Sequence, residues 1–155
     1  VFGASSPEDV PWASAGADYV LDTAGQSYTV EAAEGHLRAG AVKVLALGCC
    51  EGAPVVVPGG TEGYVPLPSE VLCTGPFELH AAAPVLWLLQ ARAGVEAAFV
   101  SAVCPVSAEQ KVVDGAGRRK WRLGRGARQN IVPSASELSH TIGVALPSLA
   151  GKVSG

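Results

Sequence analysis

Short apolar, β-branched runs that alternate with helix-length segments constrain the fold of this 155-residue chain more than any other feature. Residues 42–47 form the clearest run, which is typical of a buried parallel strand. Further strands are predicted at 18–22, 55–57, 70–72 and 95–103, and helices at 30–39, 79–93 and 136–146. Strands that alternate with helices predict an α/β fold.

Local signals support two of the predicted helices. Thr29 precedes the 30–39 helix and can cap its N-terminus with its hydroxyl. Gly94 is a natural end for the 79–93 helix. Pro84 is expected near the first turns of that helix, where a missing N–H costs least.

Several motifs recur along the chain in a fixed order. They are Pro11-Trp12, Asp18-Tyr19-Val20, His36-Leu37, Gln110-Lys111-Val112-Val113-Asp114-Gly115, Gln129-Asn130-Ile131 and Gly151-Lys152-Val153-Ser154-Gly155. In this order they resemble the P-W, D-Y-V, H-L, Q-K-T-V-D-G, Q-N-I and G-K-L-T-G motifs of the glyceraldehyde-3-phosphate dehydrogenase family. The chain is therefore similar to the central part of that family's fold.

The resemblance implies two parts. Residues 1–71 would be the C-terminal part of a Rossmann-like NAD-binding domain. Residues 72–155 would be part of a catalytic-type α+β domain, with an S-loop-like segment at 107–133. No Gly-rich turn for a dinucleotide pyrophosphate is recognisable in the sequence. The chain contains no methionine, so we expect a processed fragment or a part of a longer protein.

The resemblance also locates the family's two catalytic residues. Residues 71–84 overlay the family's V-I-S-N-A-S-C-T-T-N-C-L-A-P without a gap, which puts Phe77 at the position of the nucleophilic cysteine. An aromatic ring cannot attack an aldehyde. Cys104 takes the place of the histidine base, and a thiol is a poor proton shuttle at neutral pH. We therefore predict no catalytic residue at either position.

Carboxylates occupy the positions that resemble the family's phosphate sites. They are Glu78, Glu109 and Glu137. Two like charges 4 Å apart repel by about 4 kcal/mol at an effective dielectric constant of about 20, so a phosphorylated triose is not expected to bind. Glu78 and Glu137 also have an ordinary interpretation, because a carboxylate near a helix start complements the helix dipole.

The residues that the resemblance places at the cofactor are also changed. Ala24 replaces a threonine and Leu47 a serine, whereas Gly25 is kept. We therefore expect no cofactor, NAD included.

The four cysteines are Cys49, Cys50, Cys73 and Cys104, and none shows metal-site spacing. Zinc would require these thiols to converge with His36 or His80, so no metal site is predicted. Free thiols favour a reducing compartment, either the cytoplasm or an organelle. The apolar runs are too short to span a bilayer, so a soluble chain is expected.

Six of the eleven basic residues cluster in one segment: Arg118, Arg119, Lys120, Arg122, Arg125 and Arg128. The resemblance suggests that this segment contacts a neighbouring subunit. A solvated loop and an RNA-binding loop are the alternatives. The formal net charge of −3 gives no overall attraction to nucleic acid.

Three functions remain open. The first is a catalytically inactive relative, a pseudoenzyme, that serves as a structural or interaction subunit of a homo-oligomer, hetero-oligomer or larger assembly. The second is an active NAD-dependent, aldehyde-oxidising dehydrogenase that uses a relocated thiol, Cys73 or Cys104. The third is an RNA-binding or regulatory module that acts through the basic segment. The first is preferred because packing residues are kept while reagents are lost.

Overall fold

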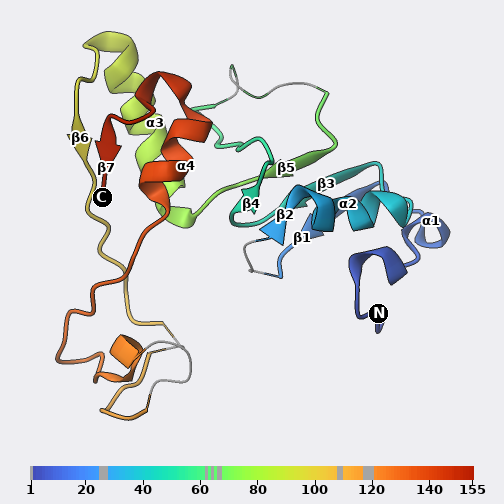
Figure 1. Ribbon diagram of the computed structural model, residues 1–155, viewed down its shortest axis with the longest axis horizontal. Coiled ribbons are helices and arrows are strands. Elements are labelled where there is room, and N and C mark those ends of the chain that lie inside the picture. Colours follow the sequence, from blue (N-terminus) through green and yellow to red (C-terminus); the bar gives the residue numbers. More distant parts are fainter. Residues whose placement is uncertain are drawn as a thin grey trace. The chain divides into compact units, whose positions relative to one another are not determined.

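The computed structural model describes residues 2–24, 28–61, 63, 65, 68–107, 110–116 and 121–155 (Figure 1). The chain groups into two compact units, one made of Val1–Val100 with Glu137–Gly155 and the other of Ser101–Ser136. The first unit has an α/β fold in which the described strand ladders are parallel. The boundary at residue 71 stays a prediction.

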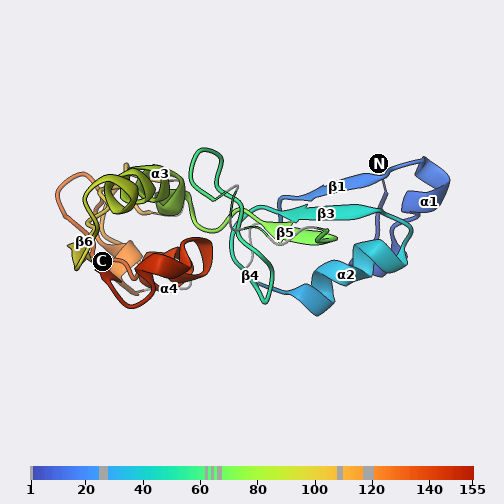
Figure 2. The ribbon, with the colours of Figure 1, turned by 90° about the horizontal axis from the view of Figure 1, so that it is seen from above.

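A three-stranded parallel sheet with the order β1-β3-β5 forms one part of the larger unit. Its strands are β1 (Tyr19–Asp22), β3 (Lys43–Ala46) and β5 (Val71–Cys73). Helix α2 (Val30–Arg38) packs against β3 and β5, and Figure 2 shows it on one face of the sheet. A two-stranded ladder joins β2 (Tyr28–Thr29) to β4 (Cys50–Glu51). The strand predictions at 18–22, 42–47 and 70–72 are confirmed to within two residues.

The same unit contains two longer helices beside a short ladder. These elements are α3 (Phe77–Arg92), α4 (Leu138–Ala145), β6 (Ala98–Phe99) and β7 (Val153–Ser154). Short helical turns complete the described elements: η1 (Pro7–Asp9), α1 (Trp12–Ala15), η2 (Trp121–Gly124) and η3 (Pro147–Leu149). α3 and α4 pack together through Leu79, Leu138 and Ile142, which are almost fully buried. The three predicted helices are thus present.

Two of the strand predictions are wrong in extent. Residues 55–57 form only a bridge from Val55 to Cys73, because the prolines on either side, Pro54 and Pro58, have no N–H to extend a ladder. The strand predicted at 95–103 shrinks to β6, because its partner β7 is only two residues long. Hydrophobic pattern alone cannot reveal how long a partner strand is.

Two of the helix signals also behave differently from the prediction. Pro84 is the eighth residue of α3 and lies inside the helix, beyond the first turn whose N–H groups lack intrahelical partners. The missing N–H therefore removes one internal hydrogen bond rather than an unused donor at the N-terminus. Thr29 is the N-cap residue of α2, but its hydroxyl makes no capping hydrogen bond. Gly94 does follow α3 with a positive φ of 75°, as a helix stop requires.

A partly buried chain of side-chain hydrogen bonds ties α1 and α2 to the end of β1. Trp12 Nε1 donates to His36 Nδ1 at 3.0 Å, and His36 Nε2 lies 3.2 Å from Asp22 Oδ2. Because Nδ1 accepts, the proton of a neutral imidazole lies on Nε2 and is donated to the carboxylate. His36 is therefore a structural residue that positions the carboxyl end of β1.

Candidate functional site

The three strands of the main sheet end in register at Asp22, Ala46 and Cys73. Backbone hydrogen bonds continue this alignment past the strands, from Leu47 N to Asp22 O at 2.8 Å and from Gly75 N to Gly48 O at 2.9 Å. Ligands of parallel sheets bind at such a carboxyl edge. The positions that the sequence associated with the cofactor and the nucleophile thus follow strands that end at one edge.

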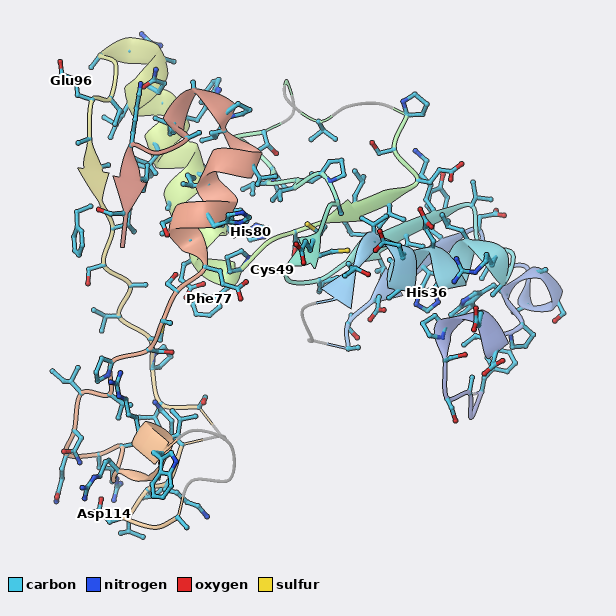
Figure 3. The ribbon with its side chains drawn as sticks, viewed as in Figure 1. His36, Cys49, Phe77, His80, Glu96 and Asp114 are labelled. Carbon is cyan, nitrogen blue, oxygen red and sulfur yellow. The ribbon has the colours of Figure 1, made fainter. Side chains whose placement is uncertain are left out.

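Phe77 is the first residue of α3, four residues after the end of β5 at Cys73, and Figure 3 shows it at the start of that helix. A helix N-terminus stabilises a thiolate, so a cysteine here would be activated. The side chain is instead a phenyl group that is 68% exposed. It provides neither a nucleophile nor a proton donor.

The residues at the cofactor positions are apolar. Leu47 follows β3 directly and is 42% exposed, and Ala24 is exposed with its N–H donated to Asp22 Oδ1 at 2.8 Å. Gly25 lies outside the described residues. This edge therefore offers two apolar side chains and a carboxylate that is already hydrogen-bonded. The described residues do not fit a nicotinamide cofactor, and no reaction step can be assigned to one.

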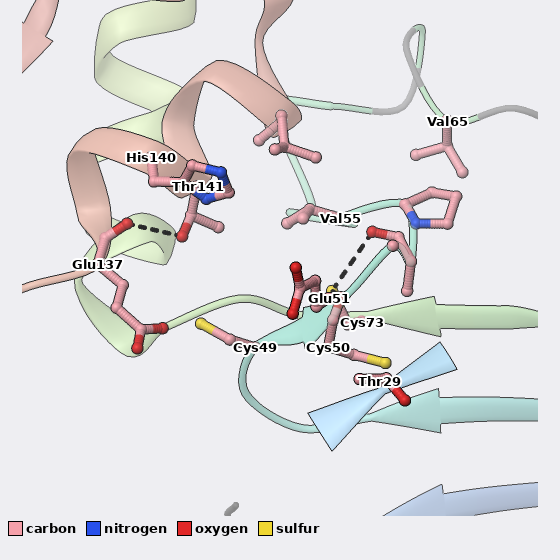
Figure 4. Close-up of a pocket in the computed structure, with 15 residues that line it drawn as sticks. Thr29, Cys49, Cys50, Glu51, Val55, Val65, Cys73, Glu137, His140 and Thr141 are labelled. Atoms are coloured by element: carbon pink, nitrogen blue, oxygen red, sulfur yellow. Dashed lines mark hydrogen bonds between the residues drawn. The ribbon is translucent and has the colours of Figure 1, made fainter. Parts of the chain in front are cut away.

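A pocket of about 620 Å³ lies between the 49–55 segment and α4 (Figure 4). Its wall combines apolar side chains with four groups that can titrate or react: Cys49, Cys50, Glu137 and His140. Thr141 Oγ1 donates to the backbone oxygen of Glu137 at 2.7 Å, which fixes the first turn of α4 beside the pocket. Pockets with a few polar groups in apolar walls are common ligand sites.

The thiols of this pocket are poor nucleophiles. Burial raises the pKa of Cys49 to about 12, and the Glu137 carboxylate adds to this because it accepts a hydrogen bond from the thiol and is negatively charged. Burial, with a smaller effect of Cys73, raises the pKa of Cys50 to about 11. Both side chains therefore remain protonated at neutral pH, and a protonated thiol does not attack a carbonyl.

Cys73 is only 1% exposed at the end of β5. Its thiol points to the backbone oxygens of Cys50 and Ala53, each 3.9 Å from the sulfur. Among the residues that the structure describes, no three histidine, cysteine or acidic side chains are arranged to hold a metal ion. His36 and His80 do not join the thiols in such a group.

Cys104, which the sequence analysis predicts at the position of the base, belongs to the other unit and is exposed. The sequence of that unit, residues 101–136, contains no histidine. No imidazole of its own unit can therefore activate this thiol or share a proton with it.

The two carboxylates expected at helix starts are found there. Glu78 lies in the first turn of α3, and Glu137 is the N-cap residue of α4, without a capping hydrogen bond from its side chain. Each complements the dipole of its helix. Glu109, the third predicted carboxylate, lies outside the described residues.

Half of the predicted basic cluster can be placed. Arg118, Arg119 and Lys120 lie outside the described residues, whereas Arg122, Arg125 and Arg128 lie in the smaller unit and are exposed. Arg125 forms an ion pair of 3.2 Å with Asp114. The pKa of the Asp114 carboxyl is lowered, first by the N–H of Gly126 and then by Arg125. One of the three described arginines is thus already paired.

The smaller unit is held together by polar contacts instead of an apolar core. Asp114 Oδ1 accepts the N–H of Gly126 at 2.7 Å, and Asn130 Nδ2 donates to the oxygen of the same glycine at 2.8 Å. Among its described residues only Gly124 and Gly126 are buried. Trp121 is 95% exposed and Ile131 99% exposed, and both line a shallow pocket of about 670 Å³. Large apolar side chains therefore face solvent next to the arginines.

Sequence reasoning missed two groupings, Cys49 with Glu137 and Trp12 with His36. Their partners are 88 and 24 residues apart in the chain, and no local pattern connects them. Within the described part of the chain, no helix is both long and apolar enough to cross a membrane.

Comparison with known proteins identifies what this chain is similar to. A family model described as the C-terminal domain of glyceraldehyde 3-phosphate dehydrogenase matches residues 79–155. The testis-specific glyceraldehyde-3-phosphate dehydrogenase of Rattus norvegicus is 35% identical over 156 residues, which cover the whole chain and 36% of that relative. The cytosolic enzyme of Gracilaria gracilis is 35% identical and the enzyme of Ogataea parapolymorpha 36% identical, and each is covered to 46%. The chain thus spans less than half the length of these curated relatives.

Proposed function

This chain belongs to the glyceraldehyde-3-phosphate dehydrogenase family, and we propose that it is a catalytically inactive member that acts as a structural or interaction subunit of an assembly. Residues 1–71 correspond to the second part of a Rossmann-like unit in this proposal. Residues 72–155 correspond to part of the catalytic-type domain, in which the S-loop-like segment 107–133 makes contacts rather than chemistry.

The observation that carries the proposal is Phe77 at the first position of α3. Nucleophilic catalysis of aldehyde oxidation needs a thiolate near a bound nicotinamide and a base to activate it. The helix start that would favour the thiolate presents a phenyl ring, and the edge beside it presents Leu47 and Ala24. Every one of these substitutions removes a functional group and leaves the fold intact.

A relocated thiol is the competing explanation, and the environments of the cysteines argue against it. Cys73 is buried and directed at backbone oxygens, and Cys49 and Cys50 are held protonated by burial. Cys104 is accessible but has no histidine within its own unit. A dehydrogenase of this type would have to work with an unactivated thiol.

The contact surface that we propose is the basic segment together with its exposed apolar neighbours. Arginine and tryptophan are enriched where proteins bind each other, because both combine large contact area with directional polar groups. Arg122 and Arg128 lie in the same short segment as Trp121, whose ring is almost fully exposed. We place a protein partner before RNA because the formal net charge of −3 gives no overall attraction to nucleic acid.

Incubation of the purified chain with glyceraldehyde 3-phosphate, NAD and phosphate tests the absence of catalysis. We expect no rise in NADH absorbance, whereas an authentic dehydrogenase in a parallel cuvette gives a steady rise. A Cys104→Ser variant is the matched control for the competing explanation. Turnover by the unmodified chain would end the proposal, and its loss in the Cys104→Ser variant would identify the relocated thiol.

The RNA alternative is tested with a fluorescent oligouridine. The unmodified chain is compared with a variant in which Arg122, Arg125 and Arg128 are replaced by alanine. We expect no binding that depends on these arginines. Binding that weakens with salt and disappears in the variant would favour the RNA-binding function instead.

A further inference from the structure

Ser6 is the one serine or threonine in the sequence that is followed directly by a proline, Pro7. A proline restricts the residue before it to an extended conformation, and Ser6 has a φ of −131° and a ψ of 157°. Proline-directed serine kinases bind the acceptor as an extended segment and accept a proline directly after it. The backbone of Ser6 therefore already has the conformation that such an enzyme requires.

The hydroxyl of Ser6 lies at the surface. Ser6 is the N-cap residue of the helical turn η1, and its Oγ donates to Asp9 Oδ2 at 2.8 Å in an exposed hydrogen bond. Residues 2–5, which precede it, are exposed and belong to no helix or strand. A kinase can therefore bind this segment after one surface hydrogen bond is broken.

The turn η1 packs against α2 and is held there by few contacts, next to the N-terminus in Figure 1. A Cβ on Gly35 would lie only 3.0 Å from Cβ of Pro7, so the turn can come this close because Gly35 has no side chain. Arg38 Nη2 donates to Glu8 Oε2 at 3.4 Å, and both side chains are exposed. Exposed ion pairs contribute little to stability, so a modest repulsion can release the turn.

A phosphate on Ser6 would supply that repulsion. Glu8 and Asp9 are both acidic and form two of the three residues of η1. A phosphoserine carries a charge of about −1.5 to −2 at pH 7, and its Oγ no longer has a proton to donate to Asp9. At about 4 Å in water, its repulsion from one carboxylate shifts an equilibrium about tenfold. The phosphate would also compete with Glu8 for Arg38.

We propose that Ser6 is a phosphorylation site for a proline-directed serine kinase, and that the phosphate releases η1 from α2. The kinase transfers the γ-phosphoryl group of ATP to Ser6 Oγ. The bond from the γ-phosphorus to the β–γ bridging oxygen breaks, ADP leaves, and the hydroxyl proton passes to the catalytic base of the kinase. This modification goes beyond the proposed function and does not rest on the absence of catalysis.

Incubation of the whole chain with ATP and a purified proline-directed kinase tests the site, with peptide mass spectrometry as the measurement. We expect one phosphate on the peptide that contains Ser6 and none on that peptide in the Ser6→Ala variant. Pro7→Ala should slow the reaction roughly tenfold or more, because the kinase loses the contact that it recognises. Ser5→Ala is the matched control and should react at the rate of the unmodified chain.

Three results would overturn the phosphorylation site. They are a chain that takes up no phosphate, a phosphate found only on another residue, and a Pro7→Ala variant that reacts as fast as the unmodified chain. A kinase that recognises acidic residues is tested in parallel, and a faster reaction with that enzyme would contradict recognition through the proline.

NMR spectroscopy of the phosphorylated chain tests the release of η1 separately. The nuclear Overhauser effect between the Pro7 Hβ and Gly35 Hα protons reports the docked turn, and the amide signal of Val44 in β3 verifies that the sheet stays folded. We expect phosphorylation to remove most of this cross-peak. In Asp9→Asn, which keeps an acceptor for the serine hydroxyl but removes the charge, phosphorylation should leave most of it. An unchanged cross-peak in the phosphorylated chain, or equal losses in both proteins, would refute the release by repulsion from Asp9.

Discussion

Replacing Glu137 by glutamine should make Cys49 more reactive towards iodoacetamide. The carboxylate raises the pKa of this thiol by accepting its proton in a hydrogen bond and by its negative charge, in addition to the larger effect of burial. Glutamine keeps the size of the side chain and removes the charge. The side chain of Glu137 makes no capping hydrogen bond to α4, so the substitution removes only a charge–dipole interaction of about 0.3–1 kcal/mol and α4 should stay folded.

The magnitude follows from the pKa of about 12, compared with an ordinary value of 9.0. At neutral pH this difference leaves about a thousandfold less thiolate than an unperturbed cysteine has. A more basic thiolate is more nucleophilic, with a Brønsted slope of about 0.4–0.5, which recovers about 20-fold of that loss. Cys49 should therefore react about 50-fold more slowly than an ordinary thiol. Each fall of one in its pKa should raise the rate about three- to fourfold.

The assay is time-resolved alkylation followed by peptide mass spectrometry, in which the exposed Cys104 of the same sample serves as the internal reference. Glu51→Gln is the matched control, because Glu51 lines the same pocket but is not among the groups that raise the pKa of Cys49. We expect a faster reaction at Cys49 for Glu137→Gln, because the pKa of its thiol falls, and no change for Glu51→Gln. Equal rates at Cys49 in all three proteins would refute the coupling to Glu137.

Three further changes should alter stability in a defined direction. Gly75→Ala places a Cβ 2.7 Å from a methyl carbon of the buried Leu79, at a φ of +69°. Gly16→Ala is the matched control, because Gly16 has a φ of +67° but open space around it. In urea denaturation, Gly75→Ala should lower the free energy of unfolding by about 1–3 kcal/mol more than Gly16→Ala. Trp12→Phe leaves the buried Nδ1 of His36 without its donor and should cost about 1–3 kcal/mol in the same assay, so an unchanged urea midpoint would contradict this hydrogen bond. The Cys49 thiol loses its proton near pH 9.0 in the unfolded chain but only near pH 12 in the folded chain. The free energy of unfolding should therefore fall as the pH rises from 9 to 12. A free energy of unfolding that does not change with pH in this range would count against the burial of the thiol.

The order of the elements could be predicted from the sequence because strands and helices leave local periodic patterns. The strands of the main sheet and all three predicted helices appear within a few residues of their expected positions. The failures share one cause. The length of β6 depends on β7, which is more than fifty residues away, and residues 55–57 are limited by what the flanking prolines cannot donate. The hydrophobic pattern indicates which face of a strand is buried, but not how many of its residues pair with a neighbouring strand.

The candidate site divides in the same way. The sequence alone predicts a phenyl group, Phe77, at the nucleophile position, because side-chain chemistry needs no coordinates to be judged. The placement of Phe77 at a helix start and the burial of the neighbouring thiols come from the fold.

By itself, the sequence determined the family and the α/β character, and it predicts Phe77 at the position of the family's nucleophile. Only the tertiary structure decided that Cys49 lies against Glu137 and that His36 is held between Trp12 and Asp22. The physical reason is that identity and local propensity belong to each residue, whereas pKa, hydrogen-bond partners and exposure are set by neighbours that the folded chain brings from distant positions.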